Sequence, residues 1–346
     1  MKKVTIKDIA REAGVSTATV SMVINHKDQA ISDATRKRVQ TVVRKNHFIP
    51  NAMAGSLVTR RTNTIGLIIP DIVNPFFPEL ARGAEDRARQ SGSNVILCNT
   101  DEKPDQEGTY LAMLAKKMVD GIIFAHSVEL SGTASAYQTA RIPIILIDRD
   151  WDSENIKGKI LVDNTNGAYM AVRHLLDQGY RSILHIAGPL KTQTARDRVE
   201  GYRKALAESG IAFDAEKVIS GSYTTDWGSQ AVRSILEDRN KYDKFDAIFC
   251  ANDQIAIGAM MELKRAGYRV PEQIGIIGFD DIHMASLTDP ALTTVRQPSY
   301  EMGWKAVDLL LEFLDQPHEE VRKIILDTSL VIRDSSMLHQ PVDQQL

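Results

Sequence analysis

The stretch VTIKDIAREAGVSTATVSMVIN (residues 4–25) predicts two short helices joined by a tight turn. Thr5, followed three residues later by Asp8, has the pattern of a capping box that begins the first helix, and Gly14 ends that helix. Ser16 then caps a second helix, TATVSMVIN. Two helices joined by a short turn that contains glycine have the spacing of a helix-turn-helix.

A third helix, DATRKRVQTVVRKN, follows Ser32. Its valines and the apolar residues of the first two helices recur at helical spacing, so each helix has one apolar face. These faces predict a compact three-helix unit with a very small core. The predicted core residues are Ile6, Ile9, Ala10, Ala13, Val20, Val23, Ile24, Val39, Val42 and Val43.

The outward positions of the second helix carry small or uncharged side chains: Thr17, Ala18, Thr19, Ser21 and Met22. Such side chains allow the helix backbone to come close to another surface. Hydroxyl groups can bond to phosphates, and Ala, Met and Thr methyl groups can contact thymine methyls. The alternative is that this helix packs against another part of the same protein.

Charge is distributed unevenly along the chain. Residues 1–63 contain 12 Lys and Arg but four Asp and Glu, which gives this segment a formal charge of +8. The whole chain carries −3, so the remaining 283 residues carry −11. This asymmetry indicates a module that binds a polyanion, joined to an acidic body, or else simply a solvated basic face.

Other totals exclude several classes of protein. No apolar run approaches the roughly 18 residues of a membrane helix, and the N-terminus lacks the pattern of a secretory signal. Cys98 and Cys250 each lie in an apolar, strand-like run, which predicts two reduced core residues. We therefore expect no membrane partner and a cytoplasmic location.

From Thr64 the pattern becomes that of an α/β protein. IGLIIP, NVILCN, GIIFA and PIILID are continuous apolar runs separated by amphipathic helices, and the pattern recurs after Asp163 with ILHIAG, AIFCAN and IGIIGFDD. Continuous apolar strands alternating with helices predict parallel sheets covered on both faces. The repetition predicts two open, doubly wound subdomains.

Polar and aromatic side chains follow these strands, at the sheet edge where α/β proteins bind ligands. Carboxylate, amide and guanidinium groups can pair with sugar hydroxyls, and aromatic rings can stack on the C–H face of a sugar. No P-loop, nucleophile elbow or zinc-protease motif is present, and the eight histidines lack metal-ligand spacing. We predict no catalytic residue, metal or cofactor, and hence no enzyme.

The opening stretch, together with IPNAMAGSL (residues 49–57), resembles the N-terminus of the lactose/galactose repressor family of bacterial transcription factors. The body resembles the type I periplasmic sugar-binding fold that this family shares. The resemblance implies a helix-turn-helix domain (1–49), a hinge helix and linker (50–63), an effector and dimerisation domain (64–335) and a tail (336–346). It divides the effector domain into one subdomain of 64–162 with 293–325, and another of 163–292 with 326–335.

The resemblance also implies which residues contact DNA. Thr17, Ala18 and Met22 would read bases, although this chain lacks the Arg, Gln or His that several members carry there. Leu57 would wedge between base pairs when the hinge helix pairs with its two-fold mate, unless it is an ordinary linker leucine. The remaining predicted DNA contacts are Thr5, Ser16, Thr19, Ser21 and Asn25.

For the cleft, the resemblance implies that the predicted effector-binding residues are Asn74, Phe76, Phe77, Asp148, Arg149, Arg198, Trp227, Asn252, Asp280 and Gln297. Four of these have plain structural alternatives. One of the two phenylalanines could belong to the core, Asn252 could cap a helix, Gln297 could belong to the crossover, and Trp227 could simply be packed in a loop.

Taken together, the sequence predicts a repressor of a carbohydrate-utilisation operon. It would bind a palindromic operator as a homodimer and be released by a small sugar, a pentose or hexose, possibly phosphorylated. The tail HQPVDQQL lacks a leucine heptad, which argues against a tetramer. The alternatives are a regulator that responds to a purine or another corepressor and, from a different class, a sugar-binding transport protein.

Overall fold

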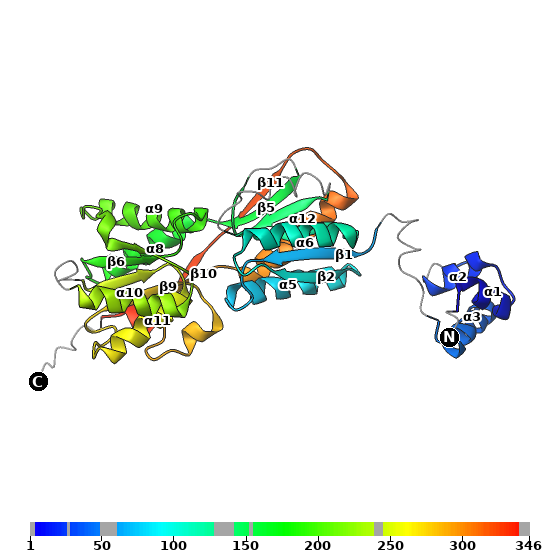
Figure 1. Cartoon of the computed structure of the whole chain (residues 1–346), viewed down its shortest axis with the longest axis horizontal. Coiled ribbons are helices and arrows are strands. Elements are labelled where there is room, and N and C mark those ends of the chain that lie inside the picture. The colour runs from blue at the N-terminus through cyan, green and yellow to red at the C-terminus, as the bar shows by residue number, and fades with distance from the viewer. Residues whose placement is uncertain are drawn as a thin grey trace, which may run out of the picture. The chain divides into compact units, whose positions relative to one another are not determined.

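The computed structural model describes residues 4–25, 28–48, 61–127, 142–151, 155–238 and 245–338 (Figure 1). The chain divides into two compact units, Met1–Thr62 and Asn63–Leu346. The predicted hinge helix and its Leu57 lie outside the described residues.

The first unit contains three helices, α1 (Ile6–Ala13), α2 (Thr17–Ile24) and α3 (Asp33–Lys45). The Thr5–Asp8 capping box is present, and Gly14 ends α1 in the left-handed conformation with φ of 63°. The buried core consists of Ile9, Ala10, Ala13, Val20, Val23, Val39 and Val42, all of which the sequence predicted. The predicted core residues Ile6, Ile24 and Val43 pack against this core but remain partly exposed.

The second unit contains two six-stranded sheets, each in its own subdomain. The first sheet is parallel throughout, in the order β11-β5-β4-β3-β1-β2. Its strands are β1 (Thr64–Ile69), β2 (Asn94–Asn99), β3 (Gly121–Phe124), β4 (Ile144–Ile147), β5 (Ile156–Val162) and β11 (Arg322–Leu326). Helices α5 (Phe76–Gln90) and α12 (Ser299–Asp315) cover one face, and α6 (Pro104–Lys116) covers the other.

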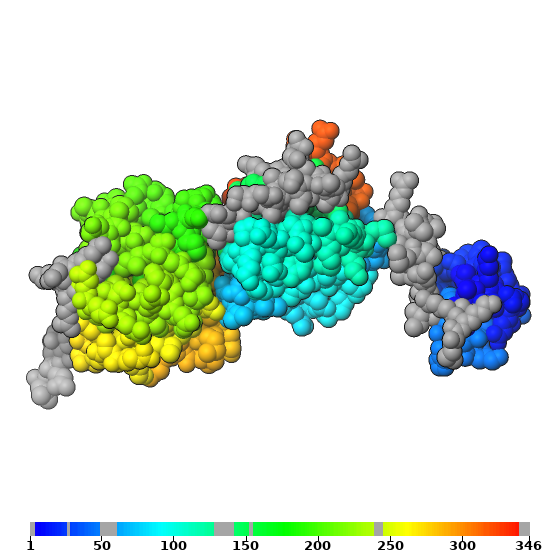
Figure 2. Space-filling model, in the orientation of Figure 1, coloured from blue at the N-terminus to red at the C-terminus, as the bar shows by residue number. Residues whose placement is uncertain are grey.

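The second sheet repeats this order as β12-β10-β9-β8-β6-β7, with an antiparallel edge strand, β12. Its strands are β6 (Ile183–Ala187), β7 (Val218–Ser220), β8 (Ala247–Cys250), β9 (Gly275–Asp280), β10 (Thr293–Arg296) and β12 (Ser329–Val331). Helices α8 (Asn164–Asp177) and α9 (Gln193–Glu208) cover one face, and α10 (Thr225–Glu237) and α11 (Asp253–Arg265) cover the other. Figure 2 shows the two subdomains as adjoining masses, cyan for most of the first and green to yellow for most of the second.

Alternation of side chains along the strands explains why both faces are covered. In β8, Ile248 and Cys250 pack on the side of α10 and α11, whereas Ala247 and Phe249 pack on the side of α8 and α9. All four residues are buried, so the strand is apolar on both faces and reads as a continuous apolar run. The predicted architecture of two doubly wound α/β subdomains is confirmed.

Two subdomain boundaries in the sequence analysis were wrong. Residues 293–296 were assigned to the first subdomain, but they form β10, which pairs with β9 in the second sheet. Likewise Leu326, assigned to the second subdomain, is the last residue of β11 and pairs with Val162. The chain therefore crosses between subdomains after β5, after β10 and after β11. A strand's sheet depends on pairing partners distant in the chain, which local patterns do not reveal.

Two glycines bring α5 and α12 into close contact. A Cβ atom at Gly83 would lie 1.9 Å from the carbonyl oxygen of Tyr300, and one at Gly303 would lie 1.9 Å from that of Leu80. Both neighbours are backbone atoms, so side-chain movement cannot relieve the overlap. The returning helix α12 is thereby packed tightly against the first subdomain.

No helix in the part of the chain that the structure describes has the length and apolarity needed to cross a membrane.

Replacing Gly83 with Ala should destabilise the second unit by roughly 1–3 kcal/mol, because overpacking forces the two helices apart. Chemical denaturation of the full chain, followed through the unfolding of the second unit, measures the change. Gln90→Ala, at an exposed position of the same helix, is the matched control and should leave stability nearly unchanged. Equal stability of Gly83→Ala and the wild type would contradict the close contact.

Candidate DNA-binding and effector sites

Helix α2 presents the predicted base-reading residues to solvent. Thr17 and Ala18 are exposed, and Met22 is 39% exposed, whereas Val20 and Val23 on the opposite face are buried. Among the described residues, this face therefore has no apolar partner within its own unit. That observation removes the alternative that α2 packs its outer face against the three-helix core.

Predicted phosphate-contacting side chains also help to hold α2. The hydroxyl oxygen of Ser16 accepts a hydrogen bond from the backbone N–H of Thr19 at 3.1 Å. At the other end, Asn25 donates to the carbonyl oxygen of Ser21 at 2.9 Å. The remaining predicted residue, Thr5, is exposed at the start of α1. Thr5, Ser16 and Asn25 are thus structural caps as well as candidate DNA contacts.

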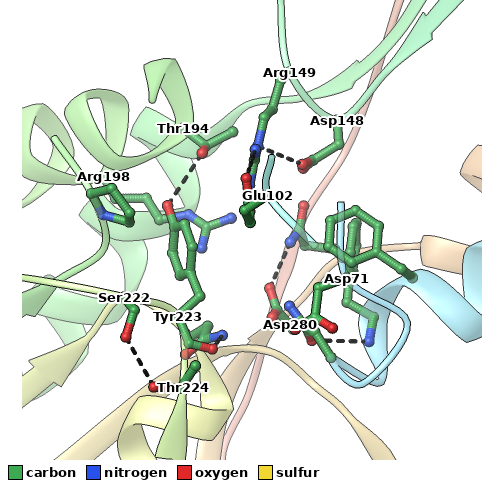
Figure 3. A pocket seen from close by; sticks show the side chains of 16 residues that line it. Asp71, Glu102, Asp148, Arg149, Thr194, Arg198, Ser222, Tyr223, Thr224 and Asp280 are labelled. Carbon is green, nitrogen blue, oxygen red and sulfur yellow. Dashed lines mark hydrogen bonds and ion pairs between the residues drawn. The ribbon is translucent and has the colours of Figure 1, made fainter. Parts of the chain in front are cut away.

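A second candidate site is a cleft of about 200 Å³ in the second unit, lined by residues of both subdomains (Figure 3). Nine of the ten predicted effector residues line it: Asn74, Phe76, Phe77, Asp148, Arg149, Arg198, Asn252, Asp280 and Gln297. The carboxyl ends of the parallel strands of both sheets meet there, as the sequence led us to expect.

Trp227 is the predicted residue that does not line this cleft. Its ring packs against the second subdomain's core and so closely against Gly221 that a Cβ atom there would lie 2.2 Å from the ring. The alternative that Trp227 is simply packed is confirmed, although the residue lies in the first turn of α10 and not in a loop. The aromatic side chain that lines the cleft from this region is Tyr223, four residues earlier.

Two buried carboxylates occupy equivalent positions in the two sheets. Asp148 directly follows β4, and Asp280 ends β9, the strand at the same place in the second sheet. Each side chain is 7% exposed, and each residue has a positive φ, 69° for Asp148 and 113° for Asp280. Strained backbone of this kind is common at ligand-binding sites.

Burial raises the pKa of both carboxyl groups. For Asp280 the pKa rises to about 7, mainly because burial penalises the charged form and also because Asp148 is nearby. The guanidinium group of Arg198 and a hydrogen bond from Gln297, with Nε2 and Oδ1 2.7 Å apart, act in the opposite direction. The cleft therefore contains acceptors that are poorly satisfied by the protein alone.

Arg198 is buried and held in a fixed orientation. Its Nε donates to Asn164 Oδ1 at 2.9 Å, its Nη1 donates to the carbonyl oxygen of Ala251, and its guanidinium carbon lies 3.8 Å from the centre of the Phe279 ring. No hydrogen bond from its Nη2 is formed within the described part of the chain. Arg198 thus offers a planar donor to a ligand in the cleft.

Arg149, 3% exposed, is held by groups of its own subdomain (Figure 3). Its Nη1 and Nη2 donate to the two carboxylate oxygens of Glu102 at 3.0 and 2.8 Å, and Nη1 also donates to the carbonyl oxygen of His126 at 2.7 Å. Its Nε lies 3.6 Å from an oxygen of Asp148. The planar fork of Arg149 is therefore already paired with a carboxylate.

The amide side chains are partly used by the fold. Asn252 caps α11 by accepting from the N–H of Ile255 at 2.9 Å, and it donates to the carbonyl oxygen of Tyr223 at 3.3 Å. Both of its roles, helix cap and cleft wall, are thus present. Gln297 lies just after β10, and its Oε1 is buried with no partner among the described residues, so it can accept a ligand hydroxyl.

The two phenylalanines lie edge to face with ring centres 5.0 Å apart. Phe76 and Phe77 are each 4% exposed and belong to the core of the first subdomain, yet both line the cleft. On the opposite wall the hydroxyl group of Tyr223 lies 3.3 Å from that of Thr194. Aromatic surface is therefore available on both sides of a bound ligand.

The sequence analysis missed seven lining residues: Asp71, Glu102, Pro189, Thr194, Ser222, Tyr223 and Thr224. Glu102 lies three residues beyond β2, whose apolar run NVILCN is visible in the sequence. Tyr223 and its neighbours follow β7, a three-residue strand too short to produce an apolar run. Applying the strand-exit rule to β2 would have identified Glu102.

An exposed helix-turn-helix and a ligand cleft between two α/β subdomains define a DNA-binding protein that responds to a small molecule. The periplasmic binding protein and sugar-binding domain of the LacI family matches residues 62–334, and the bacterial regulatory proteins of the lacI family match residues 5–51. The chain belongs to the LacI family of bacterial transcription regulators, as the sequence predicted, and is not an enzyme. A regulator of bacterial transcription works in the cytoplasm.

Relatives match nearly the whole chain. It is 37% identical to the ribose operon repressor of Halalkalibacterium halodurans over 96% of this chain and 97% of the relative, and 35% identical to the transcriptional repressor PurR of Aliivibrio salmonicida over 96% and 98%. The lac repressor dimer bound to operator and an anti-inducer has a TM-score of 0.85 at 28% identity, covering 97% of this chain and all of that one. A LacI family regulator from Enterococcus faecium with bound ribose has a TM-score of 0.71 at 31% identity, covering 80% and 100%.

Replacing Asp280 with Asn should stabilise the protein above neutral pH. Because the folded-state pKa is about 7, above the ordinary value, the buried charge destabilises the fold at pH 8, and this penalty is relieved as the pH falls through 7. The variant should exceed the wild type by roughly 1–3 kcal/mol at pH 8, with a smaller difference at pH 5. Denaturation at both pH values measures it, with the exposed Asp105→Asn as control. A stability difference between Asp280→Asn and the wild type that is the same at both pH values would contradict the raised pKa of Asp280.

Proposed function

We propose that this protein represses a carbohydrate-utilisation operon by binding a palindromic operator as a dimer, and that a small sugar in the cleft releases it. The observation that carries the proposal is the convergence of buried carboxylates, a fixed guanidinium and aromatic rings from both subdomains on one small cavity. Asp148, Asp280 and Gln297 offer acceptors, and Arg198 offers donors. Sugar hydroxyls, which both donate and accept, satisfy such a mixture.

The size of the cavity favours a monosaccharide. Clefts for drug-sized ligands occupy roughly 300–1,000 Å³, whereas this cavity is about 200 Å³. Phe76 or Phe77 on one side and Tyr223 on the other would contact the C–H faces of the ring. D-Ribose is the first sugar to test, since ribose is bound in one similar structure and a ribose operon repressor is among the relatives.

The proposed mechanism uses the position of the cleft between subdomains. A ligand that contacts Asp148 and Arg198 at once touches both subdomains, so its binding favours one angle between them. In a dimer that angle would set the spacing of the two hinge segments and hence whether both can order on DNA. Release by the sugar then follows from its preference for the angle that separates the hinges.

The proposed DNA contacts are Thr17, Ala18 and Met22 to base edges and Thr5, Ser16, Thr19, Ser21 and Asn25 to the backbone, with Leu57 in the minor groove. The exposed face of α2 supports the first group, since the side chains there are small or flexible and no charged residue blocks close approach. A DNA-binding protein with a single helix-turn-helix per chain gains affinity for DNA when two copies bind with two-fold symmetry. This favours a dimer on a palindromic operator.

Thermal unfolding of the full chain with D-ribose, D-xylose, D-glucose, D-galactose, hypoxanthine and guanine tests the effector class. We expect one sugar to raise the melting temperature, because a ligand that binds only the folded state stabilises it. A purine that does so would favour the corepressor alternative. If none of the six compounds raises the melting temperature, a small-sugar effector of these types is rejected.

Arg198→Lys should weaken the binding sugar by at least about tenfold, since an ammonium group cannot reproduce the planar guanidinium between Asn164 and the Phe279 ring. Titration calorimetry measures the sugar affinity, and operator binding without sugar should be retained. Arg203→Lys, at an exposed position of the same helix, is the control. A normal response of Arg198→Lys to the sugar would contradict the role of Arg198.

Replacing Ala18 with Gln should change which operator sequence is preferred, because a long amide at this exposed position reaches different base edges. Selection from randomised duplexes with each full-length protein compares the preferred sequences. We expect palindromes for both proteins and a change at the same position of each half-site. An unchanged consensus would reject base reading by residue 18, and a consensus without two-fold symmetry would reject the dimer.

A further inference from the structure

The turn between β2 and α6 holds Glu102 in an unusual backbone conformation. Asp101 and Glu102 are consecutive non-glycine residues with φ of 52° and 55°. The turn is fixed to the neighbouring β1–α5 segment, because the N–H of Glu102 donates to the carbonyl oxygen of Pro70 at 3.0 Å. Two left-handed residues in succession are costly, and strain of this kind tends to persist where a side chain must be aimed.

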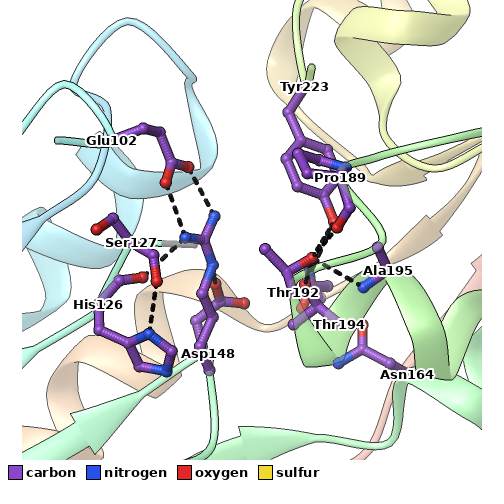
Figure 4. A network of polar contacts seen from close by, with 12 residues as sticks. Glu102, His126, Ser127, Asp148, Asn164, Pro189, Thr192, Thr194, Ala195 and Tyr223 are labelled. Atoms are coloured by element: carbon purple, nitrogen blue, oxygen red, sulfur yellow. Dashed lines mark hydrogen bonds and ion pairs between the residues drawn. The ribbon is translucent and has the colours of Figure 1, made fainter. Parts of the chain in front are cut away.

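The side chain aimed in this way reaches Arg149. Both carboxylate oxygens of Glu102 accept from its guanidinium group at 3.0 and 2.8 Å, and Figure 4 shows Glu102 with a dashed line from each oxygen. The carboxylate remains 34% exposed, whereas the side chain of Arg149 is 3% exposed. The Nη1–Nη2 edge of a guanidinium group holds one planar anion at a time in a bidentate pair. Glu102 therefore occupies the donors that a phosphate or carboxylate of a ligand would need.

The other cation among the residues that line the cleft is Arg198. Four carboxylates line the cleft, from Asp71, Glu102, Asp148 and Asp280, against two guanidinium groups, from Arg149 and Arg198. Arg198 already uses Nε and Nη1 within the protein. An anionic ligand would enter a partly desolvated space in which carboxyl groups outnumber guanidinium groups, whereas a neutral polyol would satisfy the acceptors without adding charge.

We infer that Glu102 is a specificity-determining residue that makes this cleft accept uncharged sugars and reject their phosphate esters. The inference rests on the proposed function, and it removes the phosphorylated sugars that the sequence left open. Glu102 acts in two ways. It occupies the fork of Arg149, and it places a negative charge at the cleft wall.

The test measures the affinities of D-ribose and D-ribose 5-phosphate for the full-length protein by titration calorimetry. In the wild type we expect ribose to bind at least about 100-fold more tightly than its phosphate. Glu102→Gln keeps the size of the side chain but removes its charge, and it frees part of the Arg149 fork. We expect it to narrow the ratio of the two affinities, ribose over ribose 5-phosphate, by at least about tenfold.

Asp105→Asn is the matched control, because it removes a nearby exposed carboxylate of α6 that does not line the cleft, and it should leave the ratio unchanged. Circular dichroism melting of each variant checks that it folds. If the fold of Glu102→Gln is lost, Glu102→Ala is tested in the same way.

The outcomes separate the inference from the proposed function. Wild-type protein that binds ribose 5-phosphate as tightly as ribose, or more tightly, overturns the inference and leaves a sugar effector in place. If the ratio of ribose affinity to ribose 5-phosphate affinity is the same in Glu102→Gln as in the wild type, the inference is also overturned. The phosphate ester would then be excluded by its size and not by the charge of Glu102. If neither compound binds, the ribose-type effector is rejected, and the inference is rejected with it.

Discussion

The cleft depends on one electrostatic constraint, the burial of carboxylates at the ends of two parallel sheets. Asp148 and Asp280 occupy equivalent positions in the two sheets, and each is almost wholly removed from water. Burying a charge without full compensation is expensive. The protein compensates only in part, through Arg149, Arg198 and Gln297, so the remaining acceptor capacity is available to a ligand that brings hydroxyl donors. Stability is given up at this point to make a binding site.

The crossovers place the binding site between two subdomains whose relative angle a ligand can change. The chain passes between subdomains three times, after β5, after β10 and after β11, and Gln297 in the second of these passages lines the cleft. Helix α12 is packed on α5 through Gly83 and Gly303, so the first subdomain remains a tight body although its chain is discontinuous. Two well-packed bodies with a ligand between them can change their relative angle without repacking either core, which is the kind of two-state element that allostery requires.

The DNA-binding unit, in contrast, has a very small core. Its core is seven small or medium apolar residues, and its helices rely on side-chain caps at Thr5, Ser16 and Ser32. Because so little core is available, the caps contribute a larger share of its stability than they would in the body. Residues that could touch DNA, such as Ser16 and Asn25, also hold α2 in shape. Substitution there affects recognition and stability together.

Much of the fold and of the cleft could be predicted from the sequence, because the interactions involved act between residues close together in the chain. The capping box, the left-handed Gly14 and the apolar faces determine the three helices of the first unit because each acts within a few residues. Continuous apolar runs predict a parallel sheet, and the rule that ligands bind at strand ends points to the segments that carry Arg149, Asn252 and Asp280. The family resemblance assigned the ten individual cleft residues, and all of them except Trp227 line the cavity.

Tertiary structure decided what depends on distant pairing. The assignment of β10 and β11 to their sheets follows from hydrogen bonds to strands far away in the chain. The short strand β7, which places Tyr223, has too few residues to leave a signal. Trp227 and Tyr223 lie four residues apart, and only the packing of the Trp227 ring, in the first turn of α10, against Gly221 determines which ring faces the cleft. Glu102 and Arg149 are 47 residues apart in the chain. They can form an ion pair only in the folded protein, because β2 and β4, which precede them, must first lie in one sheet.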